Sequence, residues 1–190
     1  MRHLVVYSHP YPKSFNHAIM ETYSRALQEA GHEVRVRDLY ALHFDPVLKA
    51  EELLGFTRGT VPKDILAEQE HVRWAQIITF ICPIWWGGFT SNLRGYLDRV
   101  FSLGFAYTDK PQGLLTDKKV FLINTIGAPE KVYTDTGIFK SMNMITDDII
   151  FKFCGLQVIG HKYFCSVTTC RDEERRAMLE QVKQLAQEIC

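Results

Sequence analysis

The chain has 190 residues, 46% of them hydrophobic, which is enough for one domain over residues 1–190 with a buried core. Its 22 basic residues balance its 22 acidic residues, and without a basic patch this neutral charge argues against a nucleic-acid-binding protein. The start MRHLVVYSHP is too polar for a signal peptide, and no apolar run approaches the length of a bilayer span. We therefore expect a cytoplasmic protein with no membrane insertion.

Short apolar or alternating runs predict five strands, at residues 3–7, 33–38, 77–82, 119–124 and 157–164. Helical spacing predicts helices at residues 16–30 and 62–75, one after Phe89, one from Ile138 and one at residues 173–190. Residues 39–60 have no clear period, and the ranges 107–117, which contains Pro111, and 125–137 are expected to be loops. Strands and helices alternate, which predicts an α/β fold: a doubly wound five-stranded parallel sheet of order 2-1-3-4-5, with helices on both faces.

Four of the predicted helices carry a clear apolar stripe. The first has Ile19, Tyr23, Leu27 and Ala30 on one face, and the last has Met178, Val182, Leu185 and Ile189. The fourth, which begins at Ile138, continues its stripe through Met142, Ile145, Ile149 and Phe153. The third has apolar residues at Leu93, Leu97, Val100 and Phe101, and its charged residues Arg94, Asp98 and Arg99 are expected on the opposite side. Each stripe predicts the helix face that packs on the sheet.

The five cysteines are odd in number, scattered and without a CxxC pair: Cys82, Cys154, Cys165, Cys170 and Cys190. They are interpreted as reduced thiols, not as a disulfide framework or a zinc site. Six histidines outside the first loop lack the spacing of metal ligands and are expected at the surface: His3, His17, His32, His43, His71 and His161. No metal site is predicted.

The run of residues 77–105 organises the rest of the chain. A buried strand is stopped by Pro83, and the uncharged loop Ile84-Trp85-Trp86-Gly87-Gly88-Phe89 follows. Trp85 and Trp86 taken alone are typical of a core or a dimer contact. The neighbouring glycines favour a ligand site, because they let the backbone approach a ligand closely. A flat aromatic loop at the carboxyl end of a strand suits a flat aromatic ligand.

In the predicted strand order, the loops at residues 8–16 and 83–89 face each other, with residues 124–133 beside them. Neither GxGxxG nor GxxxxGK[ST] is present. The first loop supplies His9, Ser14 and Asn16 together with the free N–H groups of a helix start, which can hold a phosphate. The alternative is that Ser14 or Asn16 only caps the helix, and capping and phosphate binding can coexist.

Five motifs carry a resemblance: SHPYPKSFNHA, DLYALHFDP, DILAEQ, PIWWG with its following helix, and RVFSLGFAYT. Over about residues 2 to 165 they resemble the NAD(P)H:quinone oxidoreductase family of flavodoxin-like fold, in its short bacterial form. The resemblance implies a flavin, NADH or NADPH as co-substrate, and a homodimer. FAD is favoured over FMN because the SFN and AEQ motifs match adenosine-side residues of the family.

The resemblance also implies site residues. The pyrophosphate side is matched by His9, Ser14, Phe15, Asn16 and Ala18, and the adenosine side by Gln69. The loop along the isoalloxazine is matched by Pro83, Ile84, Trp85 and Trp86, and the loop under the ring by Thr125, Ile126, Gly127 and Ala128. Tyr133 matches the tyrosine whose hydroxyl meets the pyrimidine end of the flavin, and it is the expected catalytic residue. The family's histidine six residues further on is replaced by Phe139, so a tyrosine–histidine relay is not expected.

The function that this implies is hydride transfer from NAD(P)H, through a bound flavin, to a quinone or similar acceptor by a ping-pong mechanism. Three alternatives remain open from the sequence. One is an FMN reductase or azoreductase, another a flavin-containing regulatory subunit of a membrane transporter, and the third a one-electron carrier. The neutral charge and the Trp85–Trp86 pair favour an enzyme over a carrier.

Overall fold

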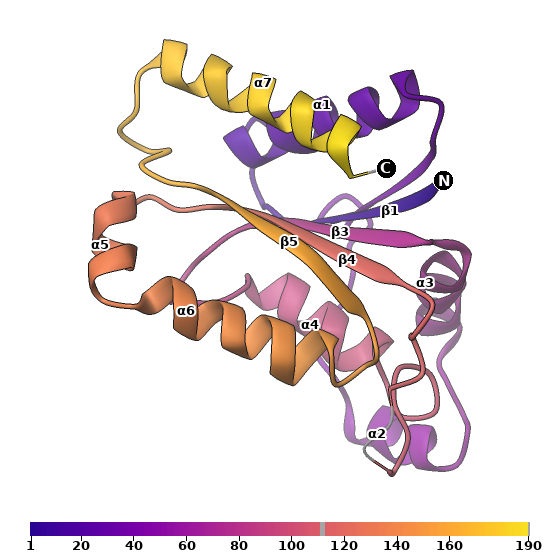
Figure 1. Ribbon diagram of the computed structural model, residues 1–190. Coiled ribbons are helices and arrows are strands. Elements are labelled where there is room, and N and C mark those ends of the chain that lie inside the picture. The colour runs from indigo at the N-terminus through magenta and orange to yellow at the C-terminus, as the bar shows by residue number, and fades with distance from the viewer. Residues whose placement is uncertain (111–112, 190) are drawn as a thin grey trace.

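The computed structural model describes residues 1–110 and 113–189, so Pro111 and Cys190 lie outside the described residues. One sheet runs through the chain in the order β2-β1-β3-β4-β5, with every neighbouring pair parallel, as predicted. Its strands are β1 (Arg2–Tyr7), β2 (Glu33–Asp38), β3 (Ile77–Pro83), β4 (Lys119–Thr125) and β5 (Gln157–Phe164). The carboxyl ends of all five strands lie at one edge of this sheet (Figure 1).

The central strand β3 is buried over its whole length, which explains its run of β-branched and apolar residues. The predicted end at residue 82 is one residue short, because Pro83 still pairs with Thr125 of β4. Pro83 has no N–H to donate to a neighbouring strand. The last hydrogen bond between the two strands is therefore made by the next amide, of Ile84, which donates to the Thr125 carbonyl at 2.8 Å.

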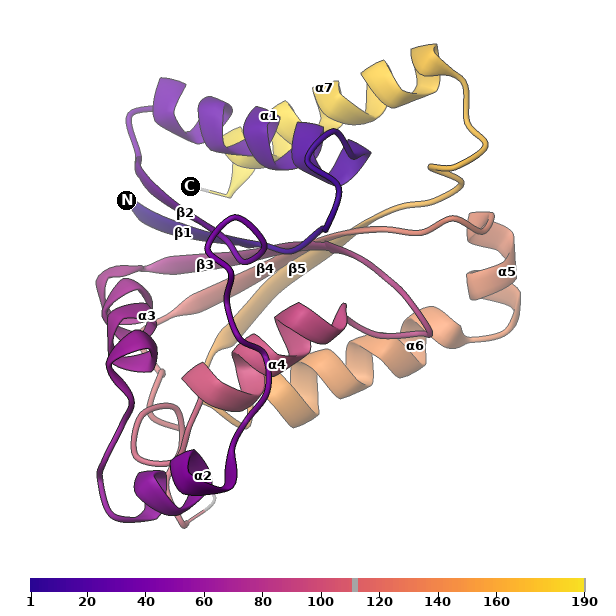
Figure 2. The same ribbon diagram turned by 180° about the vertical axis from the view of Figure 1, so that it is seen from behind.

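Helices cover both faces of the sheet (Figures 1 and 2). On one face lie α1 (Phe15–Glu29) and α7 (Asp172–Glu188), which pack against each other and against apolar side chains of β1, β3, β4 and β5. The other face is covered by α3 (Lys63–Trp74), α4 (Ser91–Val100), α6 (Ile138–Asn143) and the π-helix η1 (Met144–Phe151). None of the described helices is both long and apolar enough to cross a bilayer.

Two short helices were not expected from the sequence. Helix α2 (Ala50–Thr57) lies within the range that showed no period, and α5 (Glu130–Asp135) lies within an expected loop. Each has one turn or two and buries almost nothing, so neither needs the apolar stripe by which a helix is found in a sequence. In Figure 1, α2 lies away from the sheet, at the bottom of the view, and α5 lies beyond the carboxyl ends of the strands.

The apolar stripe expected after Ile138 does not pack on the sheet as a whole. Met142 is buried, but Ile145, Ile149 and Phe153 are exposed, Ile149 by 68%. The cause is the change from α- to π-helical bonding, in which the amide of Lys152 donates to the Asp147 carbonyl at 2.8 Å. The wider turn shifts the residue spacing, so that Phe151 enters the core instead.

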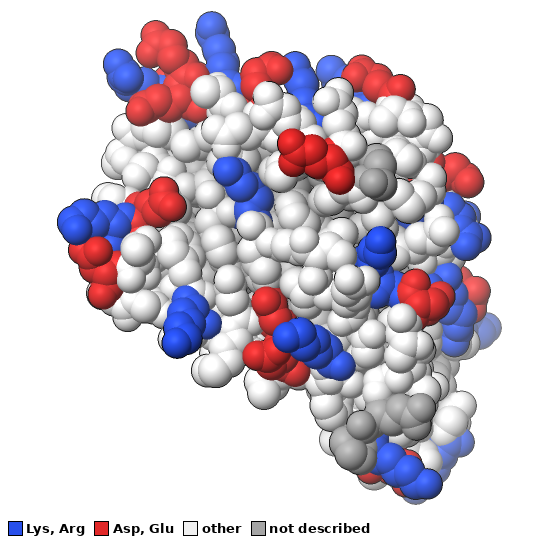
Figure 3. Space-filling model, in the orientation of Figure 1, with Lys and Arg blue, Asp and Glu red and all other residues white. Residues whose placement is uncertain are grey.

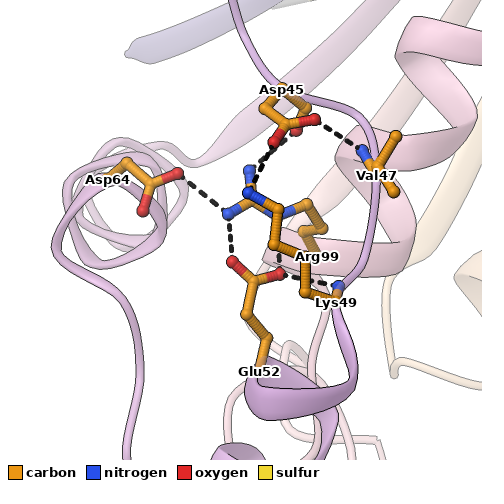
Figure 4. A network of polar contacts seen from close by, with 6 residues as sticks. All are labelled: Asp45, Val47, Lys49, Glu52, Asp64 and Arg99. Carbon is orange, nitrogen blue, oxygen red and sulfur yellow. Dashed lines mark hydrogen bonds and ion pairs between the residues drawn. The ribbon is translucent and has the colours of Figure 1, made fainter.

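Arg99 was expected on the solvent side of its helix, and this was wrong, since it is only 2% exposed. Its guanidinium donates to Asp64 Oδ2 at 3.0 Å, to the Asp45 carbonyl at 2.7 Å and, through Nε, to Glu52 Oε2 at 2.9 Å (Figure 4). A second contact joins Arg99 Nη2 to Glu52 Oε1. The network attaches α2 and α3 to α4, and these long-range partners give no local signal in the sequence.

One histidine expected at the surface is buried, and another is half-buried with most of its side chain covered. His3 lies within β1 at 0% exposure, where burial lowers its pKa to about 4 and keeps the ring neutral. His161 lies on β5, and its side chain is 7% exposed. A neutral imidazole such as that of His3 can occupy an apolar core, so a histidine in a strand pattern does not by itself indicate the surface.

Candidate active site

The first loop ends at the capped start of α1. Ser14 is the N-cap: its Oγ accepts a hydrogen bond from the His17 amide at 3.1 Å, and it forms a second hydrogen bond with the Tyr7 hydroxyl at 3.2 Å. The next two amides, of Phe15 and Asn16, precede the first hydrogen bonds within the helix, so neither has a helical acceptor among the described residues and both can bind an anion. The same loop can therefore cap the helix through Ser14 and bind an anion through the amides of Phe15 and Asn16.

Asn16 joins this loop to the end of β4. Its Nδ2 donates to Thr125 Oγ1 at 2.8 Å, while its Oδ1 is buried and has no hydrogen-bond partner among the described residues. A buried acceptor without a partner is unfavourable unless a ligand supplies a donor. Asn16 is therefore both a tie between two loops and an open acceptor.

The second loop forms a tight turn. The backbones of Trp85 and Gly88 exchange hydrogen bonds at 3.0 and 3.1 Å, and the two residues between them, Trp86 and Gly87, have φ values of 54° and 72°. These are the corner conformations of a type I′ turn, which explains a glycine at the second corner. The turn leaves Trp86 fully exposed and places the Trp85 ring 5.8 Å from that of His9.

The third loop is held from beneath by β5 and the segment after it. The Ile126 amide donates to the Phe164 carbonyl at 2.8 Å, and the Ser166 amide donates to the Ala128 carbonyl at 3.0 Å. Ile126 is consequently buried, with its side chain away from the loop surface. The amides of Gly127 and Ala128 make no hydrogen bond to another described residue, so both remain available as donors.

The three loops line one cavity of about 330 Å³ at the carboxyl end of the sheet. Most of the predicted site residues line it: His9, Ser14, Phe15, Asn16, Pro83, Ile84, Trp85, Thr125 and Gly127. Val167 and Thr168 complete the wall and were missed, because they follow β5 in a polar stretch without a recognisable motif.

The other predicted site residues do not line this cavity. Ala18 lies further along α1, and Trp86 points into solvent. Gln69 is the clear departure: it is buried in α3, and its Nε2 donates to the Val100 carbonyl and to Ser102 Oγ, both at 3.1 Å. Its amide group is occupied by α4 and the residue after it, so Gln69 has no access to the cavity.

Tyr133 lies on α5 rather than in a loop. It is half-buried against Phe139, with ring centroids 5.2 Å apart, and its hydroxyl has no hydrogen-bond partner among the described residues. Phe139 in turn lies 4.7 Å from the ring of Tyr163. A row of three aromatic rings therefore runs from α5 to β5 beneath the loops.

A second cavity, of about 180 Å³, adjoins the first at Ile84, which lines both. It lies beneath residues 87–89, and its wall is apolar except for Arg94, Asn124, Thr146 and Tyr163. Asn124 is fixed by its own bond to the Cys82 carbonyl at 2.9 Å. Within the described residues, no group of three or more His, Cys, Asp or Glu side chains is placed to hold a metal ion.

Residues 1–188 match the family described as "Flavodoxin-like fold". The chain is 37% identical to the "Uncharacterized NAD(P)H oxidoreductase" of Haemophilus influenzae, over 98% of this chain and 95% of that one. It is also 36% identical to NAD(P)H dehydrogenase (quinone) 1 of Cavia porcellus, over 83% of this chain and 66% of that one. The chain belongs to the NAD(P)H:quinone oxidoreductase family.

A solved relative of this family has the same architecture throughout. The NAD(P)H:quinone oxidoreductase from Methanothermobacter marburgensis superposes with a TM-score of 0.91 at 27% identity, covering 100% of this chain and 96% of that one. The resemblance seen in the sequence motifs therefore extends over the whole fold.

Proposed function

We propose that this chain is a flavin-dependent NAD(P)H:quinone oxidoreductase. It moves a hydride from NADH or NADPH, through the bound flavin, to a quinone-like acceptor, with the two substrates using one pocket in turn. The observation that carries this proposal is the convergence of three predicted loops on one cavity. In this cavity Asn16 presents a buried acceptor that no described residue pairs with.

The residues present fit a flavin. The amides at the start of α1 suit a phosphate group, and the wall formed by Pro83, Ile84 and Trp85 suits a flat ring. The side of the cavity at Gly127 is open, since a Cβ built there meets only Thr168, at 3.5 Å. When bound, the flavin supplies the hydride-accepting chemistry that no side chain has.

The chain's own residues then position donors where negative charge develops. The free amides of Gly127 and Ala128 are fixed by the bonds of their loop to β5 and Ser166, so they need no reorganisation to stabilise an anion. The Tyr133 hydroxyl, which has no partner among the described residues, is the proposed third donor. The Trp85 ring, which also lines the cavity, helps to exclude water.

FAD is the flavin we propose, with FMN as the alternative. One of the two sequence arguments for FAD is withdrawn, because Gln69 is buried away from the cavity. The other, the Ser14-Phe15-Asn16 motif at the helix start, stands, since all three residues line the cavity. The mass of the flavin released on denaturation distinguishes the two cofactors.

We further propose a homodimer whose flavin pockets lie at the subunit boundary. Exposed apolar side chains gather on the side of η1 and the second loop, namely Trp86, Met144, Ile145, Ile149 and Phe153. Aromatic and apolar residues of this kind are typical of interface cores. Light scattering at micromolar concentration is expected to give twice the chain mass of 22.0 kDa, and a single-chain mass would contradict the proposal.

The surface charge is consistent with small-molecule substrates. Figure 3 shows Lys and Arg interspersed with Asp and Glu, with no region of a single sign on the face that it displays. Such a surface lacks the field that would concentrate a strongly charged macromolecular partner.

The decisive experiment is a flavin titration followed by stopped-flow kinetics. FAD and FMN are titrated into the flavin-free chain, the loaded protein is reduced with NADH or NADPH, and the reduced protein is mixed with a quinone. We expect stoichiometric binding of one flavin, and rapid reoxidation by the quinone. A chain that takes up neither flavin, or a reduced protein that a quinone does not reoxidise, would contradict the proposal.

A further inference from the structure

Four polar side chains form a connected row beside the second cavity: Asp147, His161, Tyr163 and Asn143. His161 Nε2 lies 2.5 Å from Asp147 Oδ1, and His161 Nδ1 lies 3.2 Å from the Tyr163 hydroxyl. The same hydroxyl donates to Asn143 Oδ1 at 2.7 Å. The row links π-helix η1, strand β5 and the end of α6, and the His161 side chain is only 7% exposed.

With a neutral His161 ring, the contacts of this row outnumber the hydrogens available to fill them by one. The Asp147 carboxylate only accepts, so His161 Nε2 carries a hydrogen, and in a neutral ring Nδ1 is then an acceptor. Nδ1 and Asn143 Oδ1 would compete for the single hydrogen of the Tyr163 hydroxyl. With a proton on Nδ1, His161 donates to the Tyr163 hydroxyl oxygen, and Tyr163 donates its own hydrogen to Asn143 Oδ1. Each contact then has one donor and one acceptor.

The row is placed at the reaction site rather than at the outer surface. Tyr163 and Thr146 line the 180 Å³ cavity, which adjoins the proposed flavin cavity at Ile84. Thr146 Oγ1 lies 3.1 Å from Asp147 Oδ1 and 3.0 Å from the Met142 carbonyl oxygen, so a residue that lines the cavity stands directly beside the carboxylate. The Tyr163 ring also touches Phe139, the residue that replaces the family's histidine, at a centroid distance of 4.7 Å.

We propose that Tyr163 is a catalytic proton donor to the acceptor, and that His161 and Asp147 are positioning residues that return the proton to it. The inference rests on the proposed function. Reduction of a quinone to a hydroquinone consumes two electrons and two protons. The hydride brings both electrons and one proton, and the Tyr163 O–H bond breaks to give the second proton to the acceptor's oxygen. The Tyr163 phenolate oxygen then takes the proton from His161 Nδ1. Water returns a proton to Nδ1, which completes the cycle.

The charges around Tyr163 support a donor that stays protonated until it is used. Burial, with the nearby charge of Asp147, raises the pKa of the Tyr163 hydroxyl above its ordinary value. Cys82, from β3, is also neutral, because burial raises the pKa of its thiol to about 12. The cation facing the cavity is Arg94 of α4, which suits an oxygen that gains negative charge.

The first test separates the two half-reactions by stopped flow, with NADH as reductant and 1,4-benzoquinone as acceptor. In Tyr163→Phe we expect flavin reduction within about twofold of wild type and reoxidation slowed at least about tenfold, since a general acid contributes roughly 10² to 10⁴ and water replaces part of it. Reoxidation by the variant should slow further as the pH rises, because the proton then comes from solvent. His161→Gln should slow reoxidation by a similar factor, and Asp147→Asn should slow it by a smaller factor.

Tyr40→Phe is the matched control: the same hydroxyl is removed from a partly exposed tyrosine after β2, and both half-reactions should be unchanged. If Tyr163→Phe is reoxidised at the wild-type rate at every pH, Tyr163 is not the donor. If instead flavin reduction slows as much as reoxidation, the residue supports the fold of the site and not proton delivery.

The second test needs no flavin. In the flavin-free chain, labelled with ¹⁵N-histidine and ¹³C-tyrosine, the His161 ring nitrogens and the Tyr163 ring carbon are followed by NMR as the pH is raised. We expect both signals to move together, because one proton serves both side chains, and expect the joint movement to vanish in Asp147→Asn. Independent signals would overturn the proposal even in a chain that binds flavin, while absent flavin binding would contradict only the proposed function.

Discussion

Asn16 at the start of α1 and Thr125 at the end of β4 are joined by a hydrogen bond of 2.8 Å, although 109 residues separate them in the chain. The bond fixes the first and third loops relative to each other before any ligand arrives. It also sets the orientation of the Asn16 amide, and so of its acceptor oxygen, which has no hydrogen-bond partner in the part of the chain that the structure describes. Binding in such a preorganised cavity loses less conformational entropy.

Replacing Thr125 by Val is expected to weaken flavin binding about tenfold and to lower the free energy of unfolding by about 1–3 kcal/mol, because the buried Asn16 donor loses its acceptor. Thr125→Ser keeps a hydroxyl at the same position and should behave like wild type. Flavin fluorescence titration measures the affinity, and urea unfolding measures the stability. Equal flavin affinity in the two variants would show that the bond does not order the site.

Arg99→Met is expected to lower the free energy of unfolding by about 3–5 kcal/mol, since it leaves the Glu52 carboxylate, which is 10% exposed, without its cation. Arg94→Met on the same helix is the matched control. Arg94 is 55% exposed and pairs with Asp98 at 3.4 Å, so its loss should change stability by less than about 1 kcal/mol. Urea unfolding of both variants makes the comparison, and similar losses would contradict the structural role given to Arg99.

Glu52 makes the same network sensitive to acid. The hydrogen bonds from Arg99 hold the pKa of the Glu52 carboxyl below its ordinary value. A depressed pKa stabilises the folded chain at every pH above the unfolded value of about 4.3, and this contribution is lost as the pH falls toward the folded value. The stability difference between wild type and Glu52→Gln should therefore be largest near neutral pH and shrink below about pH 4.3. Urea unfolding at a series of pH values measures it, and a difference independent of pH would refute the assignment.

Tyr133→Phe is expected to slow flavin reduction by NADH roughly tenfold to a hundredfold while flavin stays bound, because one donor is lost and the amides of Gly127 and Ala128 remain. No imidazole titration is expected from position 139, which is phenylalanine. Stopped-flow reduction of the variant, compared with Tyr40→Phe, checks the result. An unchanged reduction rate at full flavin content would remove Tyr133 from the mechanism.

The sheet could be predicted because each strand carries its own signal. The run at residues 77–82 is apolar on both faces, as a central parallel strand must be, and the alternation at residues 33–38 matches an edge strand. Ile145 and Ile149 were expected on the packed face of their helix but are exposed, and this was missed because no local signal in the sequence marks the change in the helix there. A π-helical turn changes the spacing on which the assignment rests, and nothing local in the sequence announces it.

The loops of the site could be predicted from motifs, but the polar partners could not. His9, Ser14 and Asn16 stand together in one segment, whereas Asp147, His161 and Tyr163 come from two elements that meet only in the fold. The strand that holds His161 and Tyr163 is read from the sequence as an ordinary alternating run. Gln69 shows the converse limit: a motif match placed it near the ligand, and its hydrogen bonds to α4 and Ser102 place it in the core.

The packing of α7 on α1 has a consequence for synthesis on the ribosome. The first helix to be made shares its apolar cluster with Val182 and Ala186 of the last helix (Figure 1). Until those residues emerge, Ile19, Tyr23 and Leu27 of α1 lack part of their cover, and exposed apolar surface of this kind promotes aggregation of unfinished chains. A nascent chain released before α7 is complete should therefore depend on chaperones in a way that the finished protein does not.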